Sequence, residues 1–143
     1  KGAPLIGLKM VELTLQHGLC AASSFGFAIY AYLVSSRDVD QGCAYARLAL
    51  AIVDRFNAKE WIPRVHLLVH GGILGWQSPS AECLAPLKEG HKIGLETGDH
   101  EYSMLCANFY ADQAMLIRPA DEVLRECNKF AHQMVISKQD MAL

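Results

Sequence analysis

Apolar residues recur at the spacing of an amphipathic helix along almost the whole chain. In the first segment, Leu5, Leu8, Val11 and Leu15 follow one another at intervals of three or four residues, which places them on one side of a helix. The same pattern continues through the rest of the sequence. We predict about seven helices, over residues 5–17, 20–35, 39–56, 59–76, 78–97, 101–117 and from 120 onward.

Residues that favour helix ends lie at the boundaries of these segments. Gly18, Asn57 and Gly98 follow the last apolar positions of three helices, and we expect Gly98 in the left-handed conformation. The break at 36–38 supplies a capping residue, and Asp99 is expected to cap the helix that opens with His100 and Glu101. Because a carboxylate in a first turn is favoured by the helix dipole, Glu101 has a sufficient structural role.

The helices form similar pairs along the chain. An amphipathic helix followed by a more apolar one recurs after about 40 residues, a period within the range of helical repeats. Segments 35–60 and 78–101 therefore occupy equivalent places, and segment 118–134 follows at a similar interval.

Small residues support close packing of these pairs. Gly42, Ala46 and Ala49 line one face of the helix over 39–56, where a neighbouring helix could approach. We predict an all-α fold in which antiparallel helix pairs stack as a short right-handed TPR-like α-solenoid, with residues 1–143 as a single helical-repeat domain.

Composition and charge exclude several classes of function. With 52% hydrophobic residues, the 143-residue chain can build a core, so it is not disordered. The 13 Lys and Arg residues are scattered among 15 Asp and Glu, and the formal charge is −2. Without a basic stripe, nucleic acid is not an expected partner.

The cysteines and the first residues indicate the compartment. The cysteines are odd in number and far apart, which argues against metal ribbons, redox pairs and a disulfide framework; they are Cys20, Cys43, Cys83, Cys106 and Cys127. We expect small buried residues in a reducing, cytoplasmic environment. The opening "KGAPLIGLKM" lacks a signal-peptide pattern, and we expect the chain to be a segment of a longer multidomain protein.

One segment has the length of a membrane span. No charge interrupts residues 18–36, "GLCAASSFGFAIYAYLVSS". However, Ser, Gly and Ala dilute its apolarity. We therefore favour an inner helix of a helical protein over a membrane span, and expect no membrane partner.

Two histidines are the weak candidates for a metal site. His66 and His70 lie four residues apart, so both imidazoles face one side of a helix and could share a metal ion in a helical metal-dependent hydrolase. The sequence offers no evident third ligand and no Glu between them. Two packed or exposed histidines are the favoured interpretation, so we assign no metal, no cofactor and no catalytic residue.

Glycines and aromatic residues nearby have structural explanations. Gly71, Gly72 and Gly75 lack the Lys and hydroxyl that follow a phosphate loop, and they fall inside a helix, where they permit close packing or a kink. An aromatic patch is conceivable further along the chain, although core packing is favoured for its three members, Tyr102, Phe109 and Tyr110.

Three phrases carry a family resemblance: "KMVELTLQHG", "ARLALAIVDRFNAKE" and "GLETGDHEYS". From about Pro4 to Gln133 the chain resembles the tetratricopeptide-like helical region of very large sensor kinases. Those proteins carry a serine/threonine kinase-like domain and an AAA-type ATPase module before this region, and GAF and histidine kinase domains after it. The resemblance implies a scaffold inside a protein kinase, and it supplies no catalytic residues for this segment.

The dipeptide His100-Glu101 also opens the phospho-acceptor motif of histidine kinases. That motif continues with an apolar residue, Arg, Thr or Ser, and Pro, whereas Tyr102, Ser103 and Met104 follow here. His100 therefore departs from the motif, and we do not assign it as the acceptor.

These observations favour a non-catalytic scaffold that docks protein modules or relays conformational change between an ATPase and a kinase. Charged residues on the first helices of the pairs are the candidates for docking: Arg47, Lys88 and Lys92. A free-standing TPR-like protein-binding adaptor is the alternative.

Overall fold

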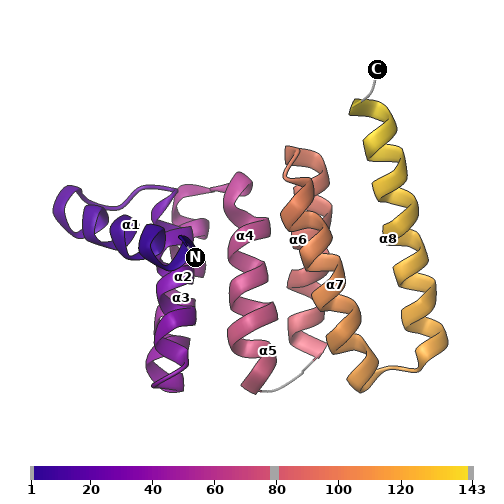
Figure 1. Cartoon of the computed structure of the whole chain (residues 1–143), viewed down its shortest axis with the longest axis horizontal. Helices are drawn as coiled ribbons and strands as arrows, with labels where there is room; N and C mark the ends of the chain where they lie inside the picture. Colours follow the sequence, from indigo (N-terminus) through magenta and orange to yellow (C-terminus); the bar gives the residue numbers. More distant parts are fainter. Residues whose placement is uncertain (1, 78–80, 142–143) are drawn as a thin grey trace.

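The computed structural model describes residues 2–77 and 81–141, and the regular structure over these ranges is helical throughout (Figure 1). Because Lys59 to Gln77 form one continuous helical run, the elements group into seven helical segments, as predicted. Their bounds are α1 Ala3–His17, α2 Ser23–Ser35, α3 Val39–Phe56, η1 Lys59–Trp61, α4 Ile62–His66, η2 Leu67–Ile73, α5 Leu74–Gln77, α6 Ala81–Thr97, α7 His100–Ile117 and α8 Ala120–Met141. The predicted start of a helix at 78–80 lies outside the described residues.

The helices from α2 to α8 lie side by side in chain order along the long axis of the molecule, and α1 crosses the first of them (Figure 1). Helix α2 packs most extensively on α3, and α6 on α7. The repeat pattern in the sequence predicts that α3 pairs with the helix that follows it. In the structure its main partner is the preceding helix α2, so this pair begins one helix earlier than predicted, whereas α6 pairs with the helix that follows it, as predicted.

Left-handed residues end three of the helices. Gly18, Asn57 and Gly98 follow α1, α3 and α6, with φ of 98°, 47° and 79°, and they are the positive-φ positions within residues 2–77 and 81–141. Glycine and asparagine adopt this conformation most readily, which is why these residues stop the helices. Before α3, Asp38 caps the helix by accepting a hydrogen bond from the Gln41 backbone N–H at 3.0 Å.

Small residues bring α2 and α3 together, as predicted. Ala46 and Ala49 are fully buried. A Cβ atom added to Gly42 would lie only 2.6 Å from Cβ of Ser35, so the two backbones approach more closely there than any larger residue allows.

The helical run from Lys59 to Gln77 contains a π-helical segment, η2. Its glycines serve close packing: added Cβ atoms would meet the ring of Phe109 at Gly71 and the ring of Tyr32 at Gly72. A wider turn leaves backbone carbonyls without their usual partners. The Gln113 side chain on α7 compensates, since its Nε2 donates to the His70 carbonyl at 2.8 Å.

The uncharged segment at 18–36 forms a turn and then α2, which begins at Ser23 rather than at the predicted residue 20. Seven residues of α2 are buried, and α2 contacts α1, α3 and η2, which confirms an inner helix. Among the residues that the structure describes, no helix combines the length and the apolarity that crossing a membrane requires.

Candidate interaction site

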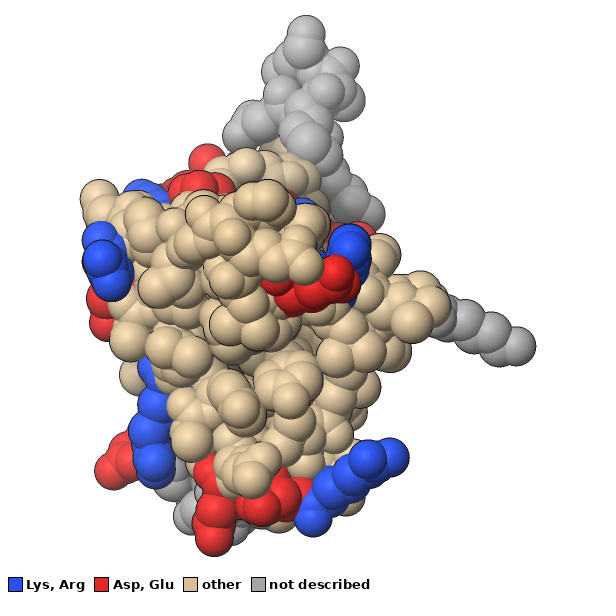
Figure 2. All heavy atoms as spheres, turned by 90° about the vertical axis from the view of Figure 1, so that its left-hand side faces the viewer, with Lys and Arg blue, Asp and Glu red and all other residues tan. Residues whose placement is uncertain are grey.

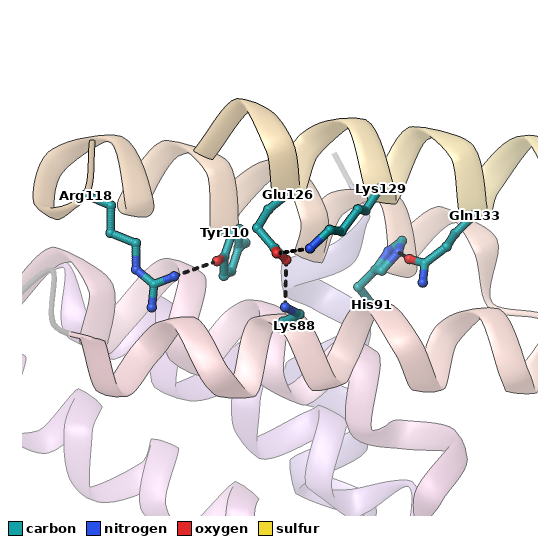
Figure 3. A network of polar contacts seen from close by, with 7 residues as sticks. All are labelled: Lys88, His91, Tyr110, Arg118, Glu126, Lys129 and Gln133. Carbon is teal, nitrogen blue, oxygen red and sulfur yellow. Dashed lines mark hydrogen bonds and ion pairs between the residues drawn. The ribbon is translucent and has the colours of Figure 1, made fainter. Parts of the chain in front are cut away.

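Polar side chains connect α8 to α6 and α7 (Figure 3). Glu126 on α8 accepts hydrogen bonds from Lys88 on α6 at 2.6 Å and from Lys129 one turn later at 2.7 Å. Only 18% of the Glu126 side chain is exposed. The Lys129 ammonium, together with that of Lys88, lowers the pKa of Glu126 to about 2, because both contacts stabilise the ionised carboxylate.

A buried histidine lies at the centre of this contact. His91 on α6 is 1% exposed. Its Nδ1 lies 2.9 Å from Oγ of Ser103 on α7, and its Nε2 lies 3.1 Å from Oε1 of Gln133 on α8. The Ser103 hydroxyl also donates to the His91 carbonyl at 2.8 Å. One side chain therefore joins three helices through its two ring nitrogens.

Apolar residues complete the packing of α8. Phe130 is buried and lies 4.6 Å from the His91 ring and 5.3 Å from the Tyr110 ring, between ring centroids. In the connection between α7 and α8, Arg118 donates to the Tyr110 hydroxyl at 3.3 Å. A cavity of about 190 Å³ remains between these helices, lined by both cationic and acidic side chains. Mixed charges of this kind favour no single ligand.

Of the three predicted docking residues, Arg47 lies on the second helix of the α2–α3 pair, whereas Lys88 and Lys92 lie on the first helix of the α6–α7 pair, as predicted. Arg47 is exposed on α3, and Lys88 and Lys92 are exposed on α6. Lys92 is 77% exposed and lies 3.9 Å from Glu96, a separation at which an exposed pair contributes little. Lys88 is held by Glu126, so part of its binding capacity is used inside the molecule.

A second polar cluster was not predicted from the sequence. The Arg64 guanidinium on α4 lies 4.8 Å from the ring centroid of Tyr102, 5.5 Å from that of Trp61 and 5.7 Å from that of Phe25. These rings come from α7, η1 and α2 respectively. Cation–π contacts therefore connect segments that are far apart in the sequence.

The prediction that Asp99 caps α7 is wrong. Asp99 occupies the capping position, but its side chain makes no capping hydrogen bond. Its Oδ2 instead accepts from Nε of Arg64 at 2.7 Å, because a charge-assisted contact to guanidinium is stronger than one to a neutral backbone N–H. A pocket of about 310 Å³ opens beside this pair, lined by Glu60, Trp61, Arg64, Thr97, Gly98 and Asp99.

The two predicted metal-site candidates lie together on the helix from 62 to 77. The rings of His66 and His70 are 5.3 Å apart between centroids. The pKa of His70 is lowered to about 4 by burial and by the neighbouring His66, and burial also lowers the pKa of His66. Nδ1 of His66 lies 3.0 Å from the Pro86 carbonyl, to which it can donate. Across the described part of the chain, no group of three potential ligands surrounds a metal position.

The remaining sequence candidates take separate positions. His100 and Glu101 fall in the first turn of α7, as predicted, and Nδ1 of His100 lies 3.3 Å from the Ser137 hydroxyl. The aromatic residues do not form one patch, since Tyr102 contacts Arg64, Phe109 packs on Gly71 and Tyr110 is buried beside Phe130.

The cysteines divide into two groups. Cys43, Cys83 and Cys106 are buried, as predicted for small core residues, and burial raises the pKa of Cys106 to about 12. Cys127 is half-buried and Cys20 is exposed, so the prediction of burial is wrong for Cys20. A hydrogen bond with Ser23 lowers the pKa of the Cys20 thiol.

Comparison with known protein families, with curated proteins and with solved structures finds no match to this chain.

Proposed function

We propose that this chain is a non-catalytic scaffold: a TPR-like α-solenoid segment of a multidomain ATPase and histidine kinase signalling protein in the cytoplasm. The observation that carries the proposal is the regular spacing of three helix ends. Left-handed helix ends at Gly18, Asn57 and Gly98 follow one another at intervals of about 40 residues, the period of helical repeats. Stacked repeats of this kind act chiefly by presenting extended surfaces to other protein segments.

The repeated unit also places two of the docking candidates in equivalent positions. Arg47 lies ten residues before Asn57, and Lys88 lies ten residues before Gly98. Both side chains are exposed, on two helices of the row that are separated by the helix over 59–77. A partner or a neighbouring module that carries acidic groups at the repeat spacing could contact both residues at once.

A relay of conformational change is supported by contacts that cross the repeats. The Arg64 cluster joins α2, α4 and α7, and His91 joins α6, α7 and α8. Since these two groups of contacts each join three helices, a displacement at one of those helices would be transmitted to the other two. The kinase context itself comes from the resemblance of the sequence.

The proposal is tested by determining the reading frame on both sides of this segment. An ATPase module upstream and a histidine kinase downstream are expected. In that full-length protein, Arg47→Ala, Lys88→Ala and Lys92→Ala combined should lower the response of autophosphorylation to nucleotide at the ATPase while the basal activities of both modules persist.

Two results would contradict the proposal. Adjacent start and stop codons would remove the kinase context and leave the free-standing adaptor. An unchanged response in the triple variant would remove the docking assignment. Lys138 can be replaced by Ala as a control, because it is a lysine outside the proposed surface residues.

A further inference from the structure

The outer side of α1 is apolar and uncovered. Five large apolar residues of this 15-residue helix are between 43% and 77% exposed: Leu5, Ile6, Leu8, Leu13 and Leu15. Figure 2 looks onto this end of the molecule, where most of the surface is neither acidic nor basic. Exposed apolar surface of this extent on one element marks an interaction site.

The way α1 packs explains why these residues stay outside. Gly7 faces the Ile29 side chain of α2, and Gly26 of α2 faces Cβ of Met10. The two backbones therefore approach closely. Because this side of α1, which includes Val11, is turned toward α2 and the core, the leucines on the other side of α1 stay outside.

Another helix pair of the same row would not cover all of them. When the helices are aligned by their left-handed ends, Leu8 and Leu15 of α1 correspond to Arg47 and Asp54 of α3, which precede Asn57 by the same ten and three residues. Arg47 and Asp54 are exposed although α3 has helices of the row on both sides. A preceding repeat would therefore leave Leu8 and Leu15 exposed, although it would cover Leu13, whose counterpart Ile52 is 2% exposed. The occupant of the surface around Leu8 and Leu15 must come from outside the row.

The charges on this face are arranged to fit a second copy. Lys9 and Glu12 lie near the middle of α1, 3.0 Å apart, with leucines on either side. Two α1 helices can pair antiparallel so that they cross at the level of Met10. Leu5 of each copy then faces Leu15 of the other copy. Lys9 of each copy lies beside Glu12 of the other, so the two-fold symmetry produces this ion pair twice. An isologous contact requires such self-complementarity.

We propose that α1 is a homodimerisation helix, which pairs antiparallel with α1 of a second copy through Leu5, Leu8 and Leu15 and through reciprocal Lys9–Glu12 contacts. This interface is independent of the docking residues Arg47, Lys88 and Lys92, so it can exist whether or not the kinase assignment holds. It would present two copies of the row with their α8 ends pointing apart, as a two-fold axis at α1 requires.

Sedimentation equilibrium of the purified 143-residue chain tests the proposal. The wild type should show a monomer–dimer equilibrium, and Leu15→Glu should weaken association at least tenfold. Leu15 is 77% exposed, so the monomer should stay folded, which circular dichroism checks. The matched control is Leu124→Glu on α8, where the side chain is 61% exposed and association should not change.

Charge reversal distinguishes self-pairing from other occupants. Lys9→Glu and Glu12→Lys should each weaken the dimer, since each homodimer then brings like charges together. An equimolar mixture of the two variants should form a heterodimer near wild-type strength, because both reciprocal contacts are opposite in sign again. A wild type that stays monomeric, an open series of oligomers, equal loss with Leu124→Glu, or a mixture that does not recover association would each overturn the proposal.

Discussion

Helices α1 and α8 lie at the two ends of the row, and their contacts with the rest of the molecule differ in chemical kind. Helix α1 is attached through glycines that let two backbones approach and through a neutral hydrogen bond between the hydroxyls of Thr14 and Ser23 at 2.8 Å, with its leucines turned outward. Helix α8 is attached through Val123 and Phe130 together with ion pairs and hydrogen bonds. Close packing without charged groups responds to changes of volume, whereas contact through charges also responds to pH and salt. The two ends should therefore fail under different perturbations.

The largest effect is expected from the apolar anchor of α8. Phe130→Ala removes a ring that is 5% exposed and contacts both His91 and Tyr110. We expect a loss of about 3 kcal/mol in the free energy of unfolding, measured by urea denaturation. Leu124→Ala, at an exposed position of the same helix, should change it by less than about 0.5 kcal/mol. If the two variants were equally stable, Phe130 would not anchor α8.

At the α1 end, Gly7→Ala is expected to destabilise the protein by about 1 kcal/mol. The added methyl overlaps the Ile29 side chain, which costs about 1–3 kcal/mol, while alanine regains up to about 1 kcal/mol of helix propensity. A double-mutant cycle with Ile29→Ala isolates the energetic cost of this overlap. In the Ile29→Ala background, Gly7→Ala should leave the free energy of unfolding unchanged or raise it. If the effects of the two substitutions on that free energy simply added, α1 would not be held by close backbone contact.

Acid should loosen α8 before α1. The pKa of Glu126 is lowered to about 2 from an ordinary value near 4.5, so its contribution is complete above pH 4.5 and is lost as the pH falls toward 2. Glu126→Gln should remove about 1 kcal/mol at neutral pH, because Lys88 and Lys129 are exposed and partly screened. Hydrogen exchange measures the effect on each helix separately. In the variant, the α8 amides should lose protection against exchange while the α1 amides keep theirs.

Glu122→Gln is the matched control for this measurement. Glu122 is exposed on the same helix, and its replacement should leave exchange of the α8 amides unchanged. Equal deprotection in both variants would show that the net charge of α8, rather than the bridge between two lysines, matters.

The smallest effect is expected at an exposed ion pair of α8. Arg125 and Asp121 are 3.0 Å apart, with side chains 68% and 71% exposed. Arg125→Ala should change the free energy of unfolding by less than about 0.5 kcal/mol, and high salt should leave that difference nearly unchanged. A larger loss would mean that charge on the outer side of α8 contributes to its attachment, which would weaken the contrast with Glu126.

The features that can be predicted from the sequence are the helix ends and helix bounds that depend on neighbouring residues. Gly18, Asn57 and Gly98 end their helices because left-handed backbone is a local preference, and the helix bounds follow from apolar spacing. Asp99 shows the limit. It precedes a helix, as Asp38 does, but Arg64 lies 35 residues earlier in the chain and takes its carboxylate. No local pattern contains that competitor.

The candidate site was predicted only in part for the same reason. Lys88 was chosen as an exposed cation, but its partner Glu126 lies 38 residues away. His91 was overlooked, although its neighbours carried a usable signal. Gly90 and Gly94 lie four apart, and added Cβ atoms would meet Cys106 and Ser103 of α7. Such a pair indicates close helix approach, which buries the residue between them.

The π-helical segment η2 sets the rotational phase of the helix that contains it. Each residue of a regular helix turns it by about 100°, so an inserted residue that is absorbed as a wider turn leaves the following residues facing as they did before. Deleting one residue within Leu67–Ile73 would therefore restore a regular helix while the residues after it keep their facing. Gly75 would still face Gln113, whereas the same deletion in a regular helix would rotate the residues after it by about 100°. The helix therefore tolerates the loss of one residue along η2 better than a regular helix does.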